Sequence, residues 1–266
     1  MAAGGQRSDL AARVLVALPA IALALFLVIE GGLIFMLGVF VFGALCLHEL
    51  YAMYARVRPV RLAGFLALAG LLLAALYGGQ YQILLVAAAA LPVLFALTLL
   101  QPQPSVAAMA LTLLGVWWIG FGLAHAVLLR GLPHGLGIVI DVLVGTFLGD
   151  TGAYLGGRLF GRRPLAPRIS PNKTVEGLAI GMLVAVLAVW LAGRYQDWLP
   201  GTHALVLGLG VALAAPLGDL FESFVKRDAG VKDSGRIFGA HGGALDRLDA
   251  VLFAVVAGYY IWAAYA

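Results

Sequence analysis

The sequence predicts an all-α protein that crosses a membrane about nine times and carries two charged loops on the cytoplasmic side. Of its 266 residues, 63% are apolar and 11% are charged, whereas soluble domains contain about 25% charged residues. The mean hydropathy is +1.01. The apolar residues also gather into runs of roughly membrane-spanning length, separated by short polar segments. These observations place the chain among polytopic membrane proteins.

The expected spans follow one another along the whole chain. They cover residues 12–28, 32–48, 62–77, 81–100, 106–129, 135–149, 174–193, 203–221 and 249–266. Backbone polar groups in lipid need internal partners, and the runs show no period-2 alternation, so we expect helices. Residues 1–130 would form an N-terminal group of about five spans. Residues 131–266 would form a C-terminal group with charged loops at 150–177 and 223–249.

The distribution of basic residues predicts the orientation. With the N-terminus in the cytoplasm, all but two of the 17 lysines and arginines fall on the cytoplasmic side, the exceptions being Arg130 and Arg194. This skew follows the positive-inside rule. We therefore expect an integral protein of a bacterial inner membrane, with both charged loops in the cytoplasm. The small net charge of +4 does not favour a nucleic-acid partner, and the single cysteine, Cys46, excludes an intrachain disulfide.

The stretch 223–249 is the most informative part of the chain. It combines basic side chains, carboxylates and five glycines between two apolar runs, a pattern suited to holding phosphates together with a metal ion. Residues that share one helix face at i, i+3, i+4 and i+7 are Asp219, Glu222, Ser223 and Lys226. Asp246 and Asp249 open the last apolar run at i, i+3. Two helix ends would thus present carboxylates to a shared space.

The stretch 150–177 is predicted to face the same side. Its three prolines, Pro164, Pro167 and Pro171, exclude a continuous helix. Lys173 lies in a Ser-Pro-x-Lys-Thr turn at a helix start, which favours contact with a phosphate. The alternative interpretation of this stretch is a basic face attracted to anionic lipid.

Three further acids lie at or near the spans. Asp141 falls near the middle of the sixth span and should face a protein or water-filled interior; its spacing leaves a role in packing and a role in substrate binding equally open. The role of Asp150 is also open. Glu49, near the end of the second span, fits a cap or an interfacial position better than a site residue.

The two stretches together resemble the signature of the phosphatidate cytidylyltransferases, also called CDP-diacylglycerol synthases. The positions that carry the resemblance are Ser223, Lys226, Arg227, Lys232, Asp233, Gly235, His241, Gly242, Gly243, Asp246, Arg247 and Asp249, with Asp150, Lys173, Thr174, Glu176 and Gly177 in the earlier stretch. The resemblance implies an integral membrane enzyme that joins CTP and phosphatidate to give CDP-diacylglycerol and pyrophosphate. It also implies a need for Mg2+, with a second cation as an open option.

The residues then take hypothetical roles in that reaction. Asp219 and Asp246 would bind the metal, with Asp249 and Glu222 as further ligands. The side chains expected to hold the CTP and lipid phosphates are Lys173, Lys226, Arg227, Lys232 and Arg247. His241, Gly242 and Gly243 would shape a phosphate cradle, and Ser223 would cap a helix, pack against its neighbours or touch phosphate. A salt-bridge network at the base of the loop is the structural alternative for all of them.

Two other functions stay open on the sequence. One is a cytidylyltransferase that acts on another lipid phosphate, such as a prenyl phosphate. The other is an ion-coupled transporter that uses the acids Asp141, Asp150 and Asp219 as a path. The P-loop pattern GxxxxGK[ST] does not occur, which disfavours an ATPase. A homodimer is also an open option.

Overall fold

The computed structural model describes residues 18–235, 237 and 242–266. This part of the chain is predominantly helical, in agreement with the predicted fold class. Six of its helices are long and apolar enough to cross a membrane, and they span Gly32–Met53, Gln80–Leu99, Val106–Gly131, Gly135–Phe160, Val175–Gly193 and Gly201–Asp228. Leu18–Glu30 and Arg61–Tyr77 are apolar but shorter. The number of nine spans therefore stays a prediction.

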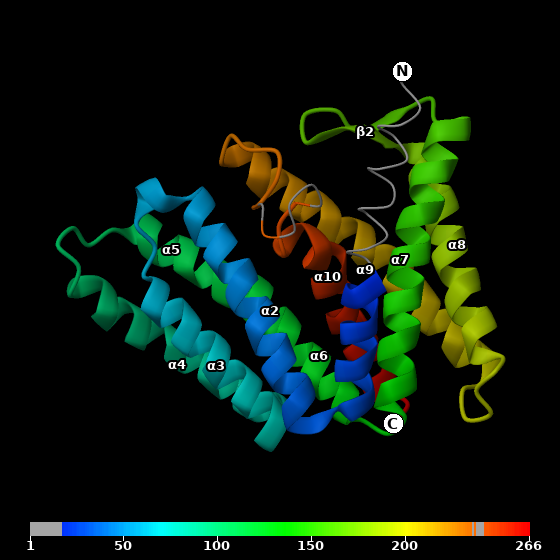
Figure 1. The fold of residues 1–266 in the computed structure, drawn as a ribbon, viewed down its shortest axis with the longest axis horizontal. Helices are drawn as coiled ribbons and strands as arrows, with labels where there is room; N and C mark the ends of the chain where they lie inside the picture. Colours follow the sequence, from blue (N-terminus) through cyan, green and yellow to red (C-terminus); the bar gives the residue numbers. More distant parts are fainter. Residues whose placement is uncertain (1–17, 236, 238–241) are drawn as a thin grey trace.

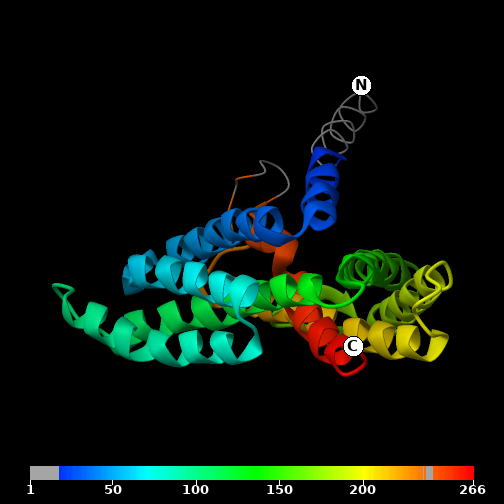
Figure 2. The ribbon, with the colours of Figure 1, turned by 90° about the horizontal axis from the view of Figure 1, so that it is seen from below.

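The first half of the chain forms one group of helices, on the left of Figure 1. It contains α2 (Gly32–Met53), α3 (Arg61–Tyr77), α4 (Gln80–Leu99) and α5 (Val106–Gly115), with a single 3-10 turn (Ala55–Val57) after α2. A π-helical turn, Val116–Gly120, joins α5 to α6 (Phe121–Gly131). The helix Leu18–Glu30 rises out of the layer that these helices form (Figure 2).

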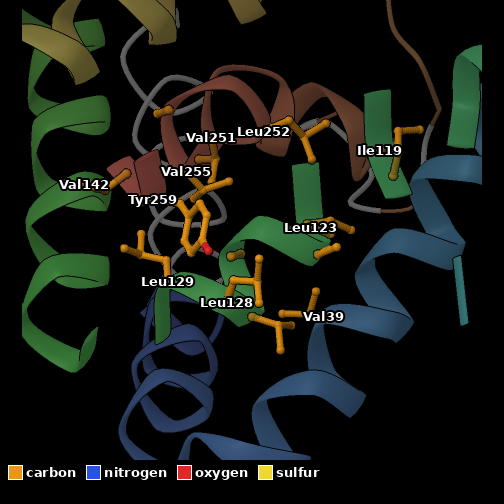
Figure 3. Packing of buried hydrophobic residues seen from close by; sticks show 14 of the residues in the cluster. Val39, Ile119, Leu123, Leu128, Leu129, Val142, Val251, Leu252, Val255 and Tyr259 are labelled. Atoms are coloured by element: carbon orange, nitrogen blue, oxygen red, sulfur yellow. The ribbon is translucent and has the colours of Figure 1, made fainter. Parts of the chain in front are cut away.

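The second half supplies the elements around the candidate site. It contains α7 (Gly135–Phe160), α8 (Val175–Gly193), α9 (Gly201–Asp228) and α10 (Leu245–Ala263). α10 packs against α6, α7 and α9 near the centre of the molecule. Val142 of α7, Leu129 of α6 and Tyr259 of α10 belong to one buried cluster there (Figure 3). Buried side chains from both halves of the chain thus share one core.

Small residues let α7 and α8 approach each other closely. Gly152 and Gly156 of α7 lie against Val184 and Ile180 of α8, and a Cβ atom built at Gly156 would be 2.7 Å from the Ile180 side chain. Small residues at such a contact allow two helix backbones to pack side by side. These two glycines therefore pack helices within one chain.

A two-stranded hairpin follows α7 and precedes α8. β1 (Pro164–Ala166) pairs antiparallel with β2 (Ser170–Thr174). Proline lacks an N–H and disfavours helix in the residue before it, so the proline-rich sequence ends α7 and extends the chain. Thr174 then caps α8, because its Oγ1 accepts a hydrogen bond from Gly177 N at 3.1 Å.

Both charged stretches contain less loop than the sequence predicts. Residues 150–160 belong to α7, residues 223–228 to α9, and residues 245–249 to α10. The change from apolar to charged sequence marks the end of the hydrocarbon-facing part of a helix, whereas the helix itself continues. Each charged stretch is therefore partly a helix end, and its side chains are held more firmly than loop residues would be.

Candidate active site

A cavity of about 560 Å³ lies between α7, α8 and α9. The hairpin contributes Ser170 and Lys173 to its lining, and the first two turns of α10 contribute Asp246 and Asp249. Figure 1 shows the hairpin, the end of α9 and the start of α10 along the upper side of the molecule. Segments that are far apart in the sequence thus surround one space.

The cavity brings together six of the side chains that the sequence singles out. These are Lys173, Asp219, Glu222, Lys226, Asp246 and Asp249. They come from the hairpin, the last turns of α9 and the first two turns of α10. Asp150 of α7 lines the same cavity. Carboxylates from separate helices therefore face a common space, as the spacing of the sequence predicts.

Lys226 connects two of these carboxylates. Its Nζ atom lies 2.5 Å from Glu222 Oε2, one helical turn away, and 2.6 Å from Asp246 Oδ1 on α10. The Glu222 side chain is 1% exposed and the other two are 11–13% exposed. A charge this well buried is costly without a partner, so the three groups depend on one another. Glu222 Oε1 is buried and has no hydrogen-bond partner.

A second ion pair closes the hairpin onto α9. Lys173 of β2 contacts Asp219, and both side chains are about 30% exposed. Arg227 also links the hairpin to α9, because its Nε donates to Ile169 O at 3.1 Å. The hairpin is thus fastened to the C-terminal part of α9 by one ion pair and one hydrogen bond.

Asp246 organises the start of α10. Its Oδ2 accepts hydrogen bonds from Gly243 N at 2.7 Å and from Ser234 N at 3.1 Å. A carboxylate at a helix N-terminus is also favoured by the helix dipole. Gly242 has φ +81°, and a Cβ atom there would be 2.6 Å from Asp246 Oδ2. Glycine at this position is therefore required by both the backbone and the carboxylate.

Glu49 of α2 also binds residues around the start of α10. It is 3% exposed, and it accepts hydrogen bonds from Ser234 Oγ, Ala244 N and Leu245 N, each at 2.9 Å. The sequence leaves a cap or an interfacial position open for Glu49, and these hydrogen bonds show a cap. The helix that it caps is α10, which no pattern within α2 could reveal.

Tyr54 follows α2 and holds the end of α9. Its hydroxyl lies 2.7 Å from Asp228 Oδ2 and 2.9 Å from Val225 O. Burial, followed by the hydrogen bond to Asp228, raises the pKa of Tyr54 well above its usual value. The hydroxyl therefore stays protonated and keeps its role as a donor at any physiological pH.

The candidate ligands fit a hard divalent cation, although Asp219, Glu222 and Asp246 are paired with lysines. Across the described residues, no three His, Cys, Asp or Glu side chains are grouped closely enough to hold a metal ion. The candidate ligands nevertheless offer carboxylate oxygens, which Mg2+ prefers. The partnerless Glu222 Oε1 is a buried acceptor beside them. These residues are therefore suited to Mg2+ in their chemistry.

The remaining predicted residues lie outside the lining of the cavity. Arg227, Lys232 and Arg247 are exposed. Ser223 is half-buried on α9. Gly243 donates its N–H to Asp246, so in this arrangement it serves the helix start. His241 lies outside the described residues.

Asp141 has a structural partner instead of a place in the cavity. It is fully buried in α7, and both of its oxygens accept hydrogen bonds from Gln196 Nε2, at 2.9 and 3.1 Å. Gln196 belongs to the turn after α8. Of the two roles that the sequence leaves open for Asp141, the geometry therefore supports packing.

Comparisons with known proteins show the family to which the chain belongs. Residues 11–265 match the model of a family described as the cytidylyltransferase family. A protein of Bacillus subtilis named phosphatidate cytidylyltransferase is 35% identical to the chain, covering 96% of the chain and 98% of that protein. A Staphylococcus epidermidis protein of the same name is 34% identical over 91% of the chain and 94% of its own length. A relative of that name in Staphylococcus aureus is 35% identical, with the same two shares covered. The chain belongs to the cytidylyltransferase family.

Proposed function

We propose that the protein transfers the cytidylyl group of CTP to phosphatidate, which gives CDP-diacylglycerol and pyrophosphate. The observation that carries this proposal is the meeting of two lysines and several carboxylates in one cavity at the ends of apolar helices. The names of the relatives that align with nearly the whole chain support the same reaction.

The chemistry requires little acid–base help from the protein. A phosphatidate oxygen attacks the α-phosphorus of CTP, the new P–O bond forms, and the bond to the β-phosphate breaks as pyrophosphate leaves. The nucleophile is already anionic near pH 7, because a phosphate monoester has its second pKa near 6. The barrier lies in bringing two polyanions together and in stabilising the charge that develops. Positioning and electrostatics address both.

Two lysines from different segments of the chain line the cavity. Lys173 on the hairpin and Lys226 on α9 line the cavity from opposite segments and are the candidates for binding phosphate oxygens. The exposed Arg227, Lys232 and Arg247 lie on neighbouring segments, where incoming CTP would meet them first. Asp219, Asp246, Asp249 and Glu222 would hold Mg2+. Bound there, the ion would neutralise phosphate charge and polarise the reacting phosphoryl group.

The membrane placement is part of the proposal. Nine spans with the hairpin, the end of α9 and the start of α10 on the cytoplasmic side would give this site access to CTP. The two basic residues that the sequence places outside the cytoplasm lie at the opposite helix ends. Arg194 follows the C-terminal end of α8, and Arg130 lies in the last turn of α6, shortly before the N-terminal end of α7. Such a separation of charge supports an orientation with the site facing the cytoplasm. The bacterial inner membrane is proposed because relatives such as the Bacillus subtilis protein are bacterial. A homodimer is a further option that the sequence leaves open.

One assay tests the reaction directly. Purified protein is incubated with phosphatidate, labelled CTP and Mg2+, with and without EDTA. We expect labelled CDP-diacylglycerol only when Mg2+ is available. Faster labelling of a prenyl phosphate than of phosphatidate would instead identify another lipid phosphate as the acceptor. Solute uptake by proteoliposomes without CTP, in the absence of any labelled liponucleotide, would replace the enzyme with a transporter.

A further inference from the structure

Glu49 is a buried carboxylate that the proposed chemistry does not use. It lies in α2, in the first half of the chain, while its three donors lie 185 to 196 residues further on. We infer that Glu49 is a positioning residue for the reaction, because its carboxylate holds the segment that sets Asp246 in the cavity. The activity readout of this inference depends on the proposed function.

Glu49 and Asp246 accept hydrogen bonds from the same small group of residues, which are Ser234, Gly243, Ala244 and Leu245. Ser234 donates its N–H to Asp246 and its hydroxyl to Glu49. Gly243 N donates to Asp246, and the next two amides, of Ala244 and Leu245, donate to Glu49. A shift of this segment away from Glu49 would therefore also move the donors of Asp246, and with them its ion pair with Lys226.

Two glycines make room for the Glu49 carboxylate. A Cβ atom at Gly235 would be 2.4 Å from Glu49 Oε1, and a Cβ atom at Gly243 would be 2.3 Å from Glu49 Oε2. Contacts this short are incompatible with any larger residue at either position unless the carboxylate moves. Glycine at these two positions therefore leaves the space that the carboxylate of α2 occupies.

The arrangement of donors requires a carboxylate and not an amide. Ala244 N donates to Oε1, whereas Leu245 N and Ser234 Oγ donate to Oε2. In Glu49→Gln, one of these two places becomes an NH2 group, which cannot accept a hydrogen bond. Either orientation of the amide then opposes at least one backbone N–H. Glu49→Gln thus keeps the size of the side chain but can no longer accept hydrogen bonds at both of its terminal atoms.

The matched control is Glu30→Gln. Glu30 is an exposed glutamate that ends the helix preceding α2, and α2 rises roughly 26 Å between its first residue and Glu49. Ser234→Ala is the second variant. It removes the hydroxyl that reaches Glu49 and keeps the N–H that reaches Asp246.

The test measures kcat and KM for CTP on monodisperse, folded protein, together with hydrogen exchange of peptides that contain Ala244 and Leu245. For Glu49→Gln we expect about a tenfold or larger fall in kcat/KM with a raised KM for CTP, and faster exchange in those peptides. For Ser234→Ala, kcat/KM should fall and exchange of these peptides should become faster, each by roughly threefold. Glu30→Gln should behave as the wild type.

Loss of folded protein alone would lower the apparent kcat and leave KM unchanged. That result, or wild-type kcat, KM and exchange in Glu49→Gln, would overturn the inference. If Glu49→Gln does not fold, Ser234→Ala decides in the same way through KM and exchange. A wild-type protein without cytidylyl transfer would refute the proposed function, and the exchange of the Ala244 and Leu245 amides would still test the positioning.

Discussion

Lys226, near the C-terminal end of α9, and Asp246, near the N-terminal end of α10, form an ion pair of 2.6 Å. Asp246 also accepts hydrogen bonds from two backbone amides of the charged loop. One carboxylate thus connects a helix end, a loop and a lysine that lines the cavity. Because these contacts share one side chain, a change at Asp246 should affect the reaction and the order of the loop together.

Asp246→Asn is expected to lower the rate of CDP-diacylglycerol formation on the order of 100-fold or more, because an electrostatic contact in the cavity is lost. The amide has only one acceptor atom, so it cannot serve Lys226 and the two amides equally. The measurement is initial rate with labelled CTP on purified, folded enzyme.

Asp197→Asn is the control for this substitution. Asp197 is exposed in the turn between α8 and α9, at the far end of both helices. We expect wild-type activity for this variant. If Asp246→Asn also retained wild-type activity, Asp246 would have no place among the metal ligands.

Lys173→Met tests the hairpin. The Lys173–Asp219 pair is about 30% exposed on both sides, so its loss should cost at most about 1 kcal/mol of stability. Loss of a phosphate-binding cation should instead lower kcat/KM on the order of 10- to 100-fold. Steady-state kinetics and thermal unfolding in detergent separate the two effects.

Arg163→Gln provides the comparison on the same segment. Its exposed side chain is replaced, while its backbone N–H can still donate to Glu176. Equal losses of activity in Arg163→Gln and Lys173→Met would point to the total charge of the basic face, and would remove the specific role of Lys173.

The sequence could predict several of the charged side chains that line the cavity, but not the contacts that hold them in place. Asp219, Glu222 and Lys226 share a helix face at a spacing of three to four residues, and the structure places all three in one lining. The pairing of Lys226 with Glu222 follows from the same spacing. The contact between Lys173 and Asp219 depends on how a hairpin folds over α9, and helical periodicity contains no information about that.

The role of Glu49 shows a second limit. Its position near the end of an apolar helix leaves a cap or an interfacial position open. The structure buries the carboxylate, and a buried carboxylate needs donors. The donors are backbone amides of a segment 195 and 196 residues away, and a backbone amide leaves no mark in the sequence. The glycines at 235 and 243 are the one trace of this contact, and their reason becomes visible only beside the carboxylate.

Glu222→Gln tests whether Mg2+ binds where we propose. Glu222 is 1% exposed, and its Oε1 has no hydrogen-bond partner. If this oxygen belongs to the metal site, the Mg2+ concentration for half-maximal rate should rise about 10- to 100-fold in Glu222→Gln. A Mg2+ titration of the initial rate measures this, with Glu30→Gln as the control. An unchanged requirement for Mg2+ at a reduced rate would assign Glu222 to Lys226 alone.

Gly156→Ala tests the close packing of α7 against α8, two helices that contribute residues to the cavity. The added methyl group would lie 2.7 Å from the Ile180 side chain, so α7 and α8 must separate or Ile180 must change its rotamer. We expect a loss of about 1–3 kcal/mol in stability, as for other overpacked contacts. In α6, Gly131 has no heavy atom within 4 Å of an added Cβ, and Gly131→Ala should stay within about 0.5 kcal/mol of wild type. Thermal unfolding of both variants in detergent measures the difference. Equal unfolding temperatures would mean that α7 and α8 have room to spare at this contact.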